Sequence, residues 1–240
     1  TAEAEFDDQR EILRIAPYSG IRKVIGDRLS RSQAVAPHVS FTTPVDCQEL
    51  VVFRDKVNSA KPEKLSILDF IVAASSLALQ RFPQVNASLQ QDRIIYYRDV
   101  NIGVAVALED GLIVPVVKNT QKMKLAEISA EIRSLAEKAR LGLLAPQDYR
   151  GGTFTVSNLG MLDVEHFTSI INPPEAAILS VGAVRKTPVV IASGGEDRIV
   201  VRPLLHLTVT VDHRLIDGRD AVLFLSEIKR MLENPVSLFV

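Results

Sequence analysis

The spacing of hydrophobic and polar residues divides the chain into alternating helical and extended segments. Apolar residues at every third or fourth position predict helices with one buried side, and residues 65–83 are apolar nearly all round, which predicts a buried helix that ends at Pro83. Pro37 and Gly142 are expected to end two further helices. The predicted helices span residues 17–35, about 46–58, 65–83, 123–141 and the final segment after Asp217.

Strands are predicted where apolar residues alternate with polar ones or form short runs between turn residues. They cover residues 38–46, 93–100, the two arms of a hairpin within 100–117, 152–157, 176–185 and 198–212. The hairpin arms are too apolar for a sheet with one wet face, so we expect both of their faces to be covered. No repeat or internal linker interrupts the pattern. It predicts one mixed α/β domain over residues 17–240, after a linker or arm at residues 1–16.

Composition narrows the class of protein. The 240 residues are 47% hydrophobic, enough for a sizeable core, and a net charge of −1 without a basic run favours neither nucleic acid nor a membrane surface as a partner. The single cysteine, Cys47, excludes a disulfide within the chain, and we expect it to be a packing residue in a reducing compartment. We expect neither a membrane span, which needs ~18 apolar residues, nor a signal peptide.

The segment LTVTVDHRLIDG contains the first candidate site. Apolar and polar residues alternate from Leu205 to Asp212, which predicts a half-buried strand, and His213 continues the apolar parity towards the interior. An imidazole with a pKa near ~6.5 suits proton transfer at neutral pH. Asp217 follows four residues later. The spacing alone leaves two other interpretations open, a hydrogen-bonded core histidine and an aspartate that merely caps the final helix.

The segment GGTFTVSNLGM contains the second candidate. Thr153, Thr155 and Ser157 share the polar face of a short strand, and the turn that follows would expose the Ser157 hydroxyl. A hydroxyl at a strand end can donate a hydrogen bond to an oxyanion, although the pattern alone favours a serine–asparagine turn without chemistry. The remaining histidines, His38, His166 and His206, are scattered singly, so we expect no metal site.

Four segments together resemble the catalytic domain of the dihydrolipoyl acyltransferases, the E2 components of the 2-oxo acid dehydrogenase complexes. They are SGIRKVIGDRLSRSQAVAPHVSFTTPVD, VNIGVAVALEDGLIVPVVK, GGTFTVSNLGMLDVEHFTSIINPPEAAIL and VDHRLIDG. The last matches the family's active-site signature DHRxxDG. The resemblance runs from about Pro17 to the C-terminus and is strongest to the acetyltransferase of pyruvate dehydrogenase. It implies a mixed sheet flanked by helices, as in chloramphenicol acetyltransferase.

The resemblance also implies roles for individual residues. His213 matches the general base that takes a proton from the thiol of coenzyme A or dihydrolipoamide, and Ser157 matches the donor to the tetrahedral oxyanion. Asp217 matches an aspartate that holds the site's geometry by pairing with an arginine of the same subunit, for which Arg22 is the candidate. Coenzyme A and the lipoyl group are then substrates and no metal is needed. The residues that bind coenzyme A are not identified.

Assembly and partners follow from the same resemblance. It implies trimers in which His213 of one subunit faces Ser157 of the next, built into a cubic or dodecahedral core in the bacterial or archaeal cytoplasm or the mitochondrial matrix. Lipoyl domains, and E1 and E3 components bound through domains that this sequence does not contain, are the expected partners. Two alternatives stay open: a free-standing acetyltransferase of the chloramphenicol type and a non-catalytic scaffold subunit. The acyl group is expected to be acetyl, with succinyl and branched-chain groups also open.

Overall fold

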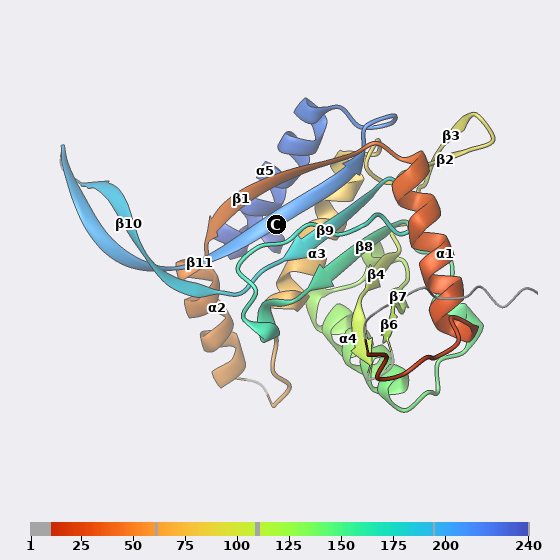
Figure 1. Ribbon diagram of the computed structural model, residues 1–240. Coiled ribbons are helices and arrows are strands. Elements are labelled where there is room, and N and C mark those ends of the chain that lie inside the picture. Colours follow the sequence, from red (N-terminus) through yellow and green to blue (C-terminus); the bar gives the residue numbers. More distant parts are fainter. Residues whose placement is uncertain (1–10, 61, 109–110, 194, 240) are drawn as a thin grey trace, which may run out of the picture.

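The computed structural model describes residues 11–60, 62–108, 111–193 and 195–239 (Figure 1). The helices are α1 (Gly20–Val35), α2 (Gln48–Ser59), α3 (Ile67–Arg81), α4 (Leu125–Arg140) and α5 (Gly218–Glu233), with 3-10 turns η1 (Thr120–Lys122), η2 (Pro146–Asp148), η3 (Gly160–Leu162) and η4 (Pro235–Leu238). The strands are β1 (His38–Asp46), β2 (Ala87–Gln90), β3 (Arg93–Tyr96), β4 (Ile102–Val104), β5 (Val106–Leu108), β6 (Gly111–Ile113), β7 (Val116–Val117), β8 (Phe154–Asn158), β9 (Ala177–Val181), β10 (Arg185–Ser193) and β11 (Glu196–Asp212).

The main sheet is mixed, which confirms the predicted fold class. Its strand order is β1-β11-β9-β8-β4-β7, and β10 pairs with the outer part of β11. Strands β4, β8 and β9 run parallel to one another, whereas the other pairings in this sheet are antiparallel. The pairs β2–β3 and β5–β6 form two small separate sheets. Helices α2, α3 and α5 lie behind the sheet in the view of Figure 1.

The two faces of the main sheet differ in chemistry. On the face towards the helices, neighbouring strands place Val156, Leu179 and Val209 side by side, and all three are fully buried. Phe224 of α5 packs edge-on against Phe154 of β8, with ring centroids 5.6 Å apart. The opposite face is polar, and we call it the hydroxyl face; it comprises Ser40, Thr42, Thr155, Ser157, Ser180, Thr208 and Thr210.

Several predicted helices form where the pattern places them. Helix α3 is almost wholly buried, as predicted, and it begins with a capping box in which Ser66 Oγ accepts a hydrogen bond from the Asp69 amide. Helix α4 ends before Gly142, whose φ of +68° suits a glycine stop. Helix α1 also forms, but Ser32 is its one buried residue among those whose side chains are described. The apolar side of α1 therefore has little to pack against within this chain.

Two predictions about burial need correction. The predicted half-buried strand, β11, is buried on both faces near its end, and the buried hydroxyls of Thr208 and Thr210 are hydrogen-bonded to Thr42 and Ser40 of the neighbouring strand β1. The hairpin arms within 100–117 are covered only in part. Their inner strands β4 and β7 are buried, whereas Leu108 at the outer end is exposed.

The long hairpin of β10 and β11 was not fully predicted from sequence. Strand β10 pairs along its whole length with residues 196–204, and this arm projects from the left-hand end of the sheet in Figure 1. One face of the arm is apolar, because Val190 lies opposite Ile199 and Val201 follows two residues later. These three side chains are 63%, 78% and 64% exposed. The arm thus presents an apolar surface that nothing in the described chain covers.

The start of the chain lies partly outside the described residues. Residues 1–10 of the predicted arm fall there, and residues 11–19 contain no helix or strand and are exposed. Among the described helices, none combines the length and the apolar character needed to cross a bilayer.

Candidate active site

His213 follows the end of β11 in a tight turn. Its backbone amide donates to the carbonyl of Pro37 over 2.9 Å, which fixes the chain beside the start of β1. The amides of Leu215 and Ile216 both donate to the carbonyl of Asp212, at 3.0 and 3.1 Å. The side chain of His213 is exposed, so the prediction that it faces the interior is wrong for the single chain. An exposed imidazole on a well-fixed backbone is accessible to a substrate or a second protein surface.

The residues that flank His213 form an ion pair that the sequence analysis missed. Arg214 Nε and Nη2 donate to the two carboxylate oxygens of Asp212 at 3.0 and 2.6 Å, and the Arg214 amide donates to the same carboxylate at 3.0 Å. The hydrogen bond to Asp212 raises the pKa of the Arg214 guanidinium. A bidentate pair of this kind has a defined geometry. It braces the turn on both sides of His213, and opposite charges on either side of the histidine were the signal in the sequence.

Asp217 occupies the N-cap position of α5, but its side chain makes no capping hydrogen bond and is exposed. Gly218 approaches the ring of Phe41 so closely that a Cβ there would lie 3.2 Å from Phe41 Cζ. Arg22, the expected partner of Asp217, lies in the first turn of α1, roughly 20 Å along that helix from Val35. Among the described residues, no hydrogen bond or ion pair joins Arg22 to Asp217. The structure does not bring this predicted pair together.

Ser157 is the penultimate residue of β8 and is partly exposed on the hydroxyl face. The turn after it is fixed by Asn158, whose Oδ1 accepts a hydrogen bond from the Gly160 amide at 2.9 Å. A side chain at position 160 would clash, because its Cβ would lie 2.7 Å from the carbonyl oxygen of Gly182. The glycine therefore permits the tight turn that leaves the Ser157 hydroxyl accessible.

The sheet separates Ser157 from His213 within one chain. Ser157 lies opposite Ser180 of β9, and Ser180 lies opposite Thr208, five residues before His213. With about 4.8 Å between strands and about 3.3 Å per residue along a strand, the two residues are roughly 20 Å apart. A hydroxyl and an imidazole that act on one carbonyl must both lie within hydrogen-bond reach of it. One chain alone does not meet that condition.

The other histidines have structural neighbours. His38 Nδ1 lies 2.7 Å from the Ala36 carbonyl, and its Nε2 accepts a hydrogen bond from the Ile171 amide. The rings of His166 and His206 are 5.9 Å apart, with Glu165 4.0 Å from His206. In the described part of the chain, no group of three or more potential ligands is arranged to hold a metal ion.

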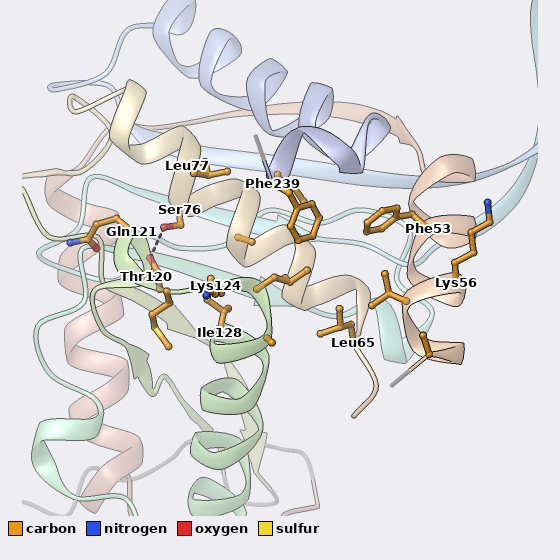
Figure 2. Close-up of a pocket in the computed structure, with 17 residues that line it drawn as sticks. Phe53, Lys56, Leu65, Ser76, Leu77, Thr120, Gln121, Lys124, Ile128 and Phe239 are labelled. Atoms are coloured by element: carbon orange, nitrogen blue, oxygen red, sulfur yellow. Dashed lines mark hydrogen bonds between the residues drawn. The ribbon is translucent and has the colours of Figure 1, made fainter. Parts of the chain in front are cut away.

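A cavity of about 880 Å³ lies on the helical side, away from these residues (Figure 2). It opens between α2, α3 and α4, and Phe53, Leu65, Ile128 and Phe239 line it. Its wall includes a hydrogen bond between the hydroxyls of Ser76 and Thr120, and Lys56, Gln121 and Lys124 also line it. Neither His213 nor Ser157 borders it. The candidate site is therefore an open surface at the sheet's end rather than this cavity.

Two curated relatives of the chain are acetyltransferase components of pyruvate dehydrogenase complexes. The chain is 38% identical over 234 residues to the dihydrolipoyllysine-residue acetyltransferase component of the pyruvate dehydrogenase complex of Rickettsia prowazekii, covering 96% of this chain and 56% of the relative. It is 41% identical over 226 residues to the mitochondrial component of Schizosaccharomyces pombe, covering 93% and 47%. The chain thus spans about half the length of these relatives.

Solved structures agree in fold. Dihydrolipoamide acetyltransferase of Azotobacter vinelandii, studied for the roles of a serine, a histidine and an asparagine in its mechanism, superposes with a TM-score of 0.90 at 31% identity, covering 100% of this chain and 99% of that one. The cubic core of a pyruvate dehydrogenase multienzyme complex gives 0.90 at 32%, with the same coverage. A chloramphenicol acetyltransferase, with a TM-score of 0.55 and 16% identity over 86% of this chain and 94% of that one, shares the fold.

The family assignment covers nearly the whole chain. Residues 11–240 match the family described as 2-oxoacid dehydrogenases acyltransferase (catalytic domain). The relatives' names, the superposed cores and the exposed His213 turn agree with that match. The chain therefore belongs to the family of 2-oxoacid dehydrogenase acyltransferase catalytic domains.

Proposed function

We propose that this chain transfers an acetyl group between dihydrolipoamide and coenzyme A, as the catalytic core of a pyruvate dehydrogenase type of complex. The observation behind the proposal is the pair of accessible groups, the His213 imidazole and the Ser157 hydroxyl, that a single chain holds too far apart to act together. The acetyltransferase names of the relatives support acetyl as the acyl group. Because the relatives are bacterial and mitochondrial, the proposal allows either the bacterial cytoplasm or the mitochondrial matrix as the location.

The chemistry needs a base and an oxyanion donor. A thiol has a pKa near ~8.5 and is mostly protonated at neutral pH, so a base is needed to remove its proton during attack. In this proposal His213 accepts that proton from coenzyme A or dihydrolipoamide. Attack on the thioester carbonyl places negative charge on its oxygen, and the Ser157 hydroxyl donates a hydrogen bond to it. As the intermediate collapses, the proton passes from His213 to the leaving thiol.

The site is completed by a second copy of the chain. His213 and Ser157 of one chain are roughly 20 Å apart, so each is available to a different neighbour. The apolar face of the arm, with Val190, Ile199 and Val201, and the sparsely packed helix α1 are surfaces that such a neighbour would cover. A trimer in which each His213 meets the next subunit's Ser157 satisfies this geometry. The superposition on a cubic core supports further assembly.

Substitution of His213 tests its proposed role as the general base. His213→Ala is expected to lower kcat for transfer from acetyl-CoA to dihydrolipoamide by about 10²–10⁴-fold, the usual contribution of a general base. Assembly should be unchanged, because the side chain is exposed. His166→Ala, another exposed histidine, is the matched control and should keep wild-type kcat. A His213→Ala protein with unchanged turnover would overturn the proposal.

Mixing two inactive variants tests whether the site is shared. Co-expression of His213→Ala chains with Ser157→Ala chains gives mixed trimers, in which about one site in four combines a wild-type base with a wild-type hydroxyl. Activity near a quarter of wild type is expected. Ser157→Ala trimers and His213→Ala trimers mixed only after assembly are the control. If the co-expressed protein recovers no transferase activity, both residues act within one chain.

A further inference from the structure

The turn before β9 buries a carboxyl group that the proposed reaction does not use. Glu175 ends the sequence Asn-Pro-Pro-Glu, and only 7% of the residue is exposed. Burial of a carboxyl group is costly unless its oxygens are hydrogen-bonded. The partners of Glu175 therefore indicate what the buried group contributes.

Glu175 is held on both of its carboxyl oxygens. Thr155 Oγ1 donates to Oε2 at 2.6 Å, and Asn172 Nδ2 donates to Oε1 at 3.1 Å. Gly152 leaves room for the group, since a Cβ there would lie 2.9 Å from Glu175 Oε1. The carboxyl group is thus fixed in one position against β8.

These contacts join the strand of Ser157 to the turn of His213. Thr155 precedes Ser157 by two residues, and both lie on the hydroxyl face of β8. The carbonyl of Ala176, directly after Glu175, accepts a hydrogen bond from the Asp212 amide at 2.9 Å. Asp212 in turn forms the ion pair that braces His213. A displacement of Glu175 would therefore be transmitted to both candidate catalytic residues.

Few charges act on Glu175. Arg28 of α1 donates to the Pro173 carbonyl and is the charged side chain near enough to act on the carboxyl group among the described residues. Two other titratable groups reach the same turn, but through its backbone: His38 accepts from the Ile171 amide, and Asp212 bonds to it through its own amide. Within the described chain, Glu175 has no salt bridge to a cationic side chain and shares no proton with a second carboxyl group.

The environment favours the neutral acid. Burial raises the pKa of Glu175 from 4.5 to about 8, against the opposing effects of the hydrogen bonds from Thr155 and Asn172 and the charge of Arg28. At neutral pH the group is therefore mostly protonated. Above about pH 8 it ionises and places a negative charge in the interior between β8 and the preceding turn.

We propose that Glu175 is a positioning residue for acyl transfer: through Thr155 it sets the Ser157 hydroxyl relative to the turn that presents His213. The inference rests on the proposed acyltransferase function. Because Ser157 and His213 of one chain belong to two different sites in that proposal, Glu175 connects neighbouring sites of the assembly. The hydrogen bonds from Thr155 and Asn172 are available to either protonation state, and ionisation adds a buried charge without an ion-pair partner in the described chain at the same position.

The test compares kcat against pH for the assembled wild type, Glu175→Gln and Glu175→Ala, with acetyl-CoA and dihydrolipoamide. Gln keeps the shape and stays neutral, so Glu175→Gln should match wild type at neutral pH. One pH unit above a pKa of about 8, about one tenth of wild type remains neutral, so wild-type kcat should fall below that of Glu175→Gln, by at most about ten-fold, because the buried charge disturbs the turn. Glu175→Ala should lower kcat at every pH. Substrate ionisation is common to all three proteins and cancels in the comparison.

Thr155→Val is the second variant, and it removes the hydroxyl without removing the carboxyl group. It should lower kcat, and combining it with Glu175→Ala should lower kcat no further, since both act through one hydrogen bond. If Glu175→Ala fails to assemble, the kcat of Thr155→Val still tests the positioning role. Glu137→Gln, on the exposed side of α4, is the matched control.

The outcomes separate the two proposals. Parallel pH profiles for wild type and Glu175→Gln, or a Thr155→Val protein with wild-type kcat, would overturn the positioning role while leaving the acyltransferase function intact. A wild-type assembly without transferase activity would overturn the proposed function, and the role of Glu175 with it.

Discussion

The two faces of the main sheet follow different rules. On the helical face the central strands are buried by helices of the same chain, and Phe224 packs against both Phe82 and Phe154. On the hydroxyl face, Thr208 and Thr210 are satisfied by neighbours in the sheet and Ser157 is partly exposed. The arm and the His213 turn are accessible at the two ends of β11. The core on the helical face is complete within a single chain, whereas these accessible parts are available to a second copy and a substrate.

The largest effect is expected on the helical face. Phe224 is fully buried between two other aromatic rings, and Phe224→Ala leaves a cavity there. The free energy of unfolding should fall by about 3–5 kcal/mol. Val222→Ala, on the exposed side of the same helix, should change it by no more than about 0.5 kcal/mol. Chemical denaturation of both variants measures the difference. Equal losses would contradict the conclusion that the contact of Phe224 with the sheet stabilises the helical face.

A smaller effect, on assembly rather than folding, is expected from the arm. Ile199 is 78% exposed in the chain, so Ile199→Ser should leave the unfolding of a single chain unchanged. If a second copy buries this side chain, the change weakens association by about 1.5–3 kcal/mol. Sedimentation velocity on dilution measures it. Arg198→Ser, one residue away on the opposite face of the arm, is the control, and equal behaviour of the two variants would argue against an apolar contact.

This contrast also explains what could be predicted from sequence. Helix α3 was predictable because its apolar residues and Pro83 are local signals of a buried, terminated helix. Strand β10 was missed beyond its first residue, because an exposed arm carries no core-facing alternation, and Pro188 within it argues against a central strand. The local sequence pattern predicts an element well where the chain buries that element's own apolar residues, and it fails for the arm, which the chain does not cover.

The site was predictable as residue types but not as geometry. His213, Ser157 and Asp217 stand out by motif, yet the separation of His213 from Ser157 depends on the order β8-β9-β11, which no local pattern encodes. The parity rule placed His213 in the interior because it assumes that the same chain covers both ends of a strand. Glu175 gave no signal, since its partner Thr155 is 20 residues away.

A third effect depends on pH. The folded-state pKa of Glu175 is raised from 4.5 to about 8, so between these values the folded protein holds a proton that the unfolded chain has released. Stability contributed by this group is therefore greatest at low pH and is lost as pH rises through that window, by up to about 1.4 kcal/mol per pH unit. Denaturation of wild type and Glu175→Gln across the window isolates the contribution. Curves with the same slope would show that Glu175 is ionised in the folded state.

The smallest effect concerns two helix caps. Ser66 accepts the capping hydrogen bond at the start of α3, so Ser66→Ala should lower the free energy of unfolding by about 1 kcal/mol. Asp217 holds the same position in α5 without such a bond, and Asp217→Ala should cost about 0.5 kcal/mol or less. A loss of transferase activity in Asp217→Ala would then reflect the site rather than the helix. If Asp217→Ala instead destabilises the chain as much as Ser66→Ala and keeps its activity, the aspartate stabilises α5 as a helix cap and has no role in the site.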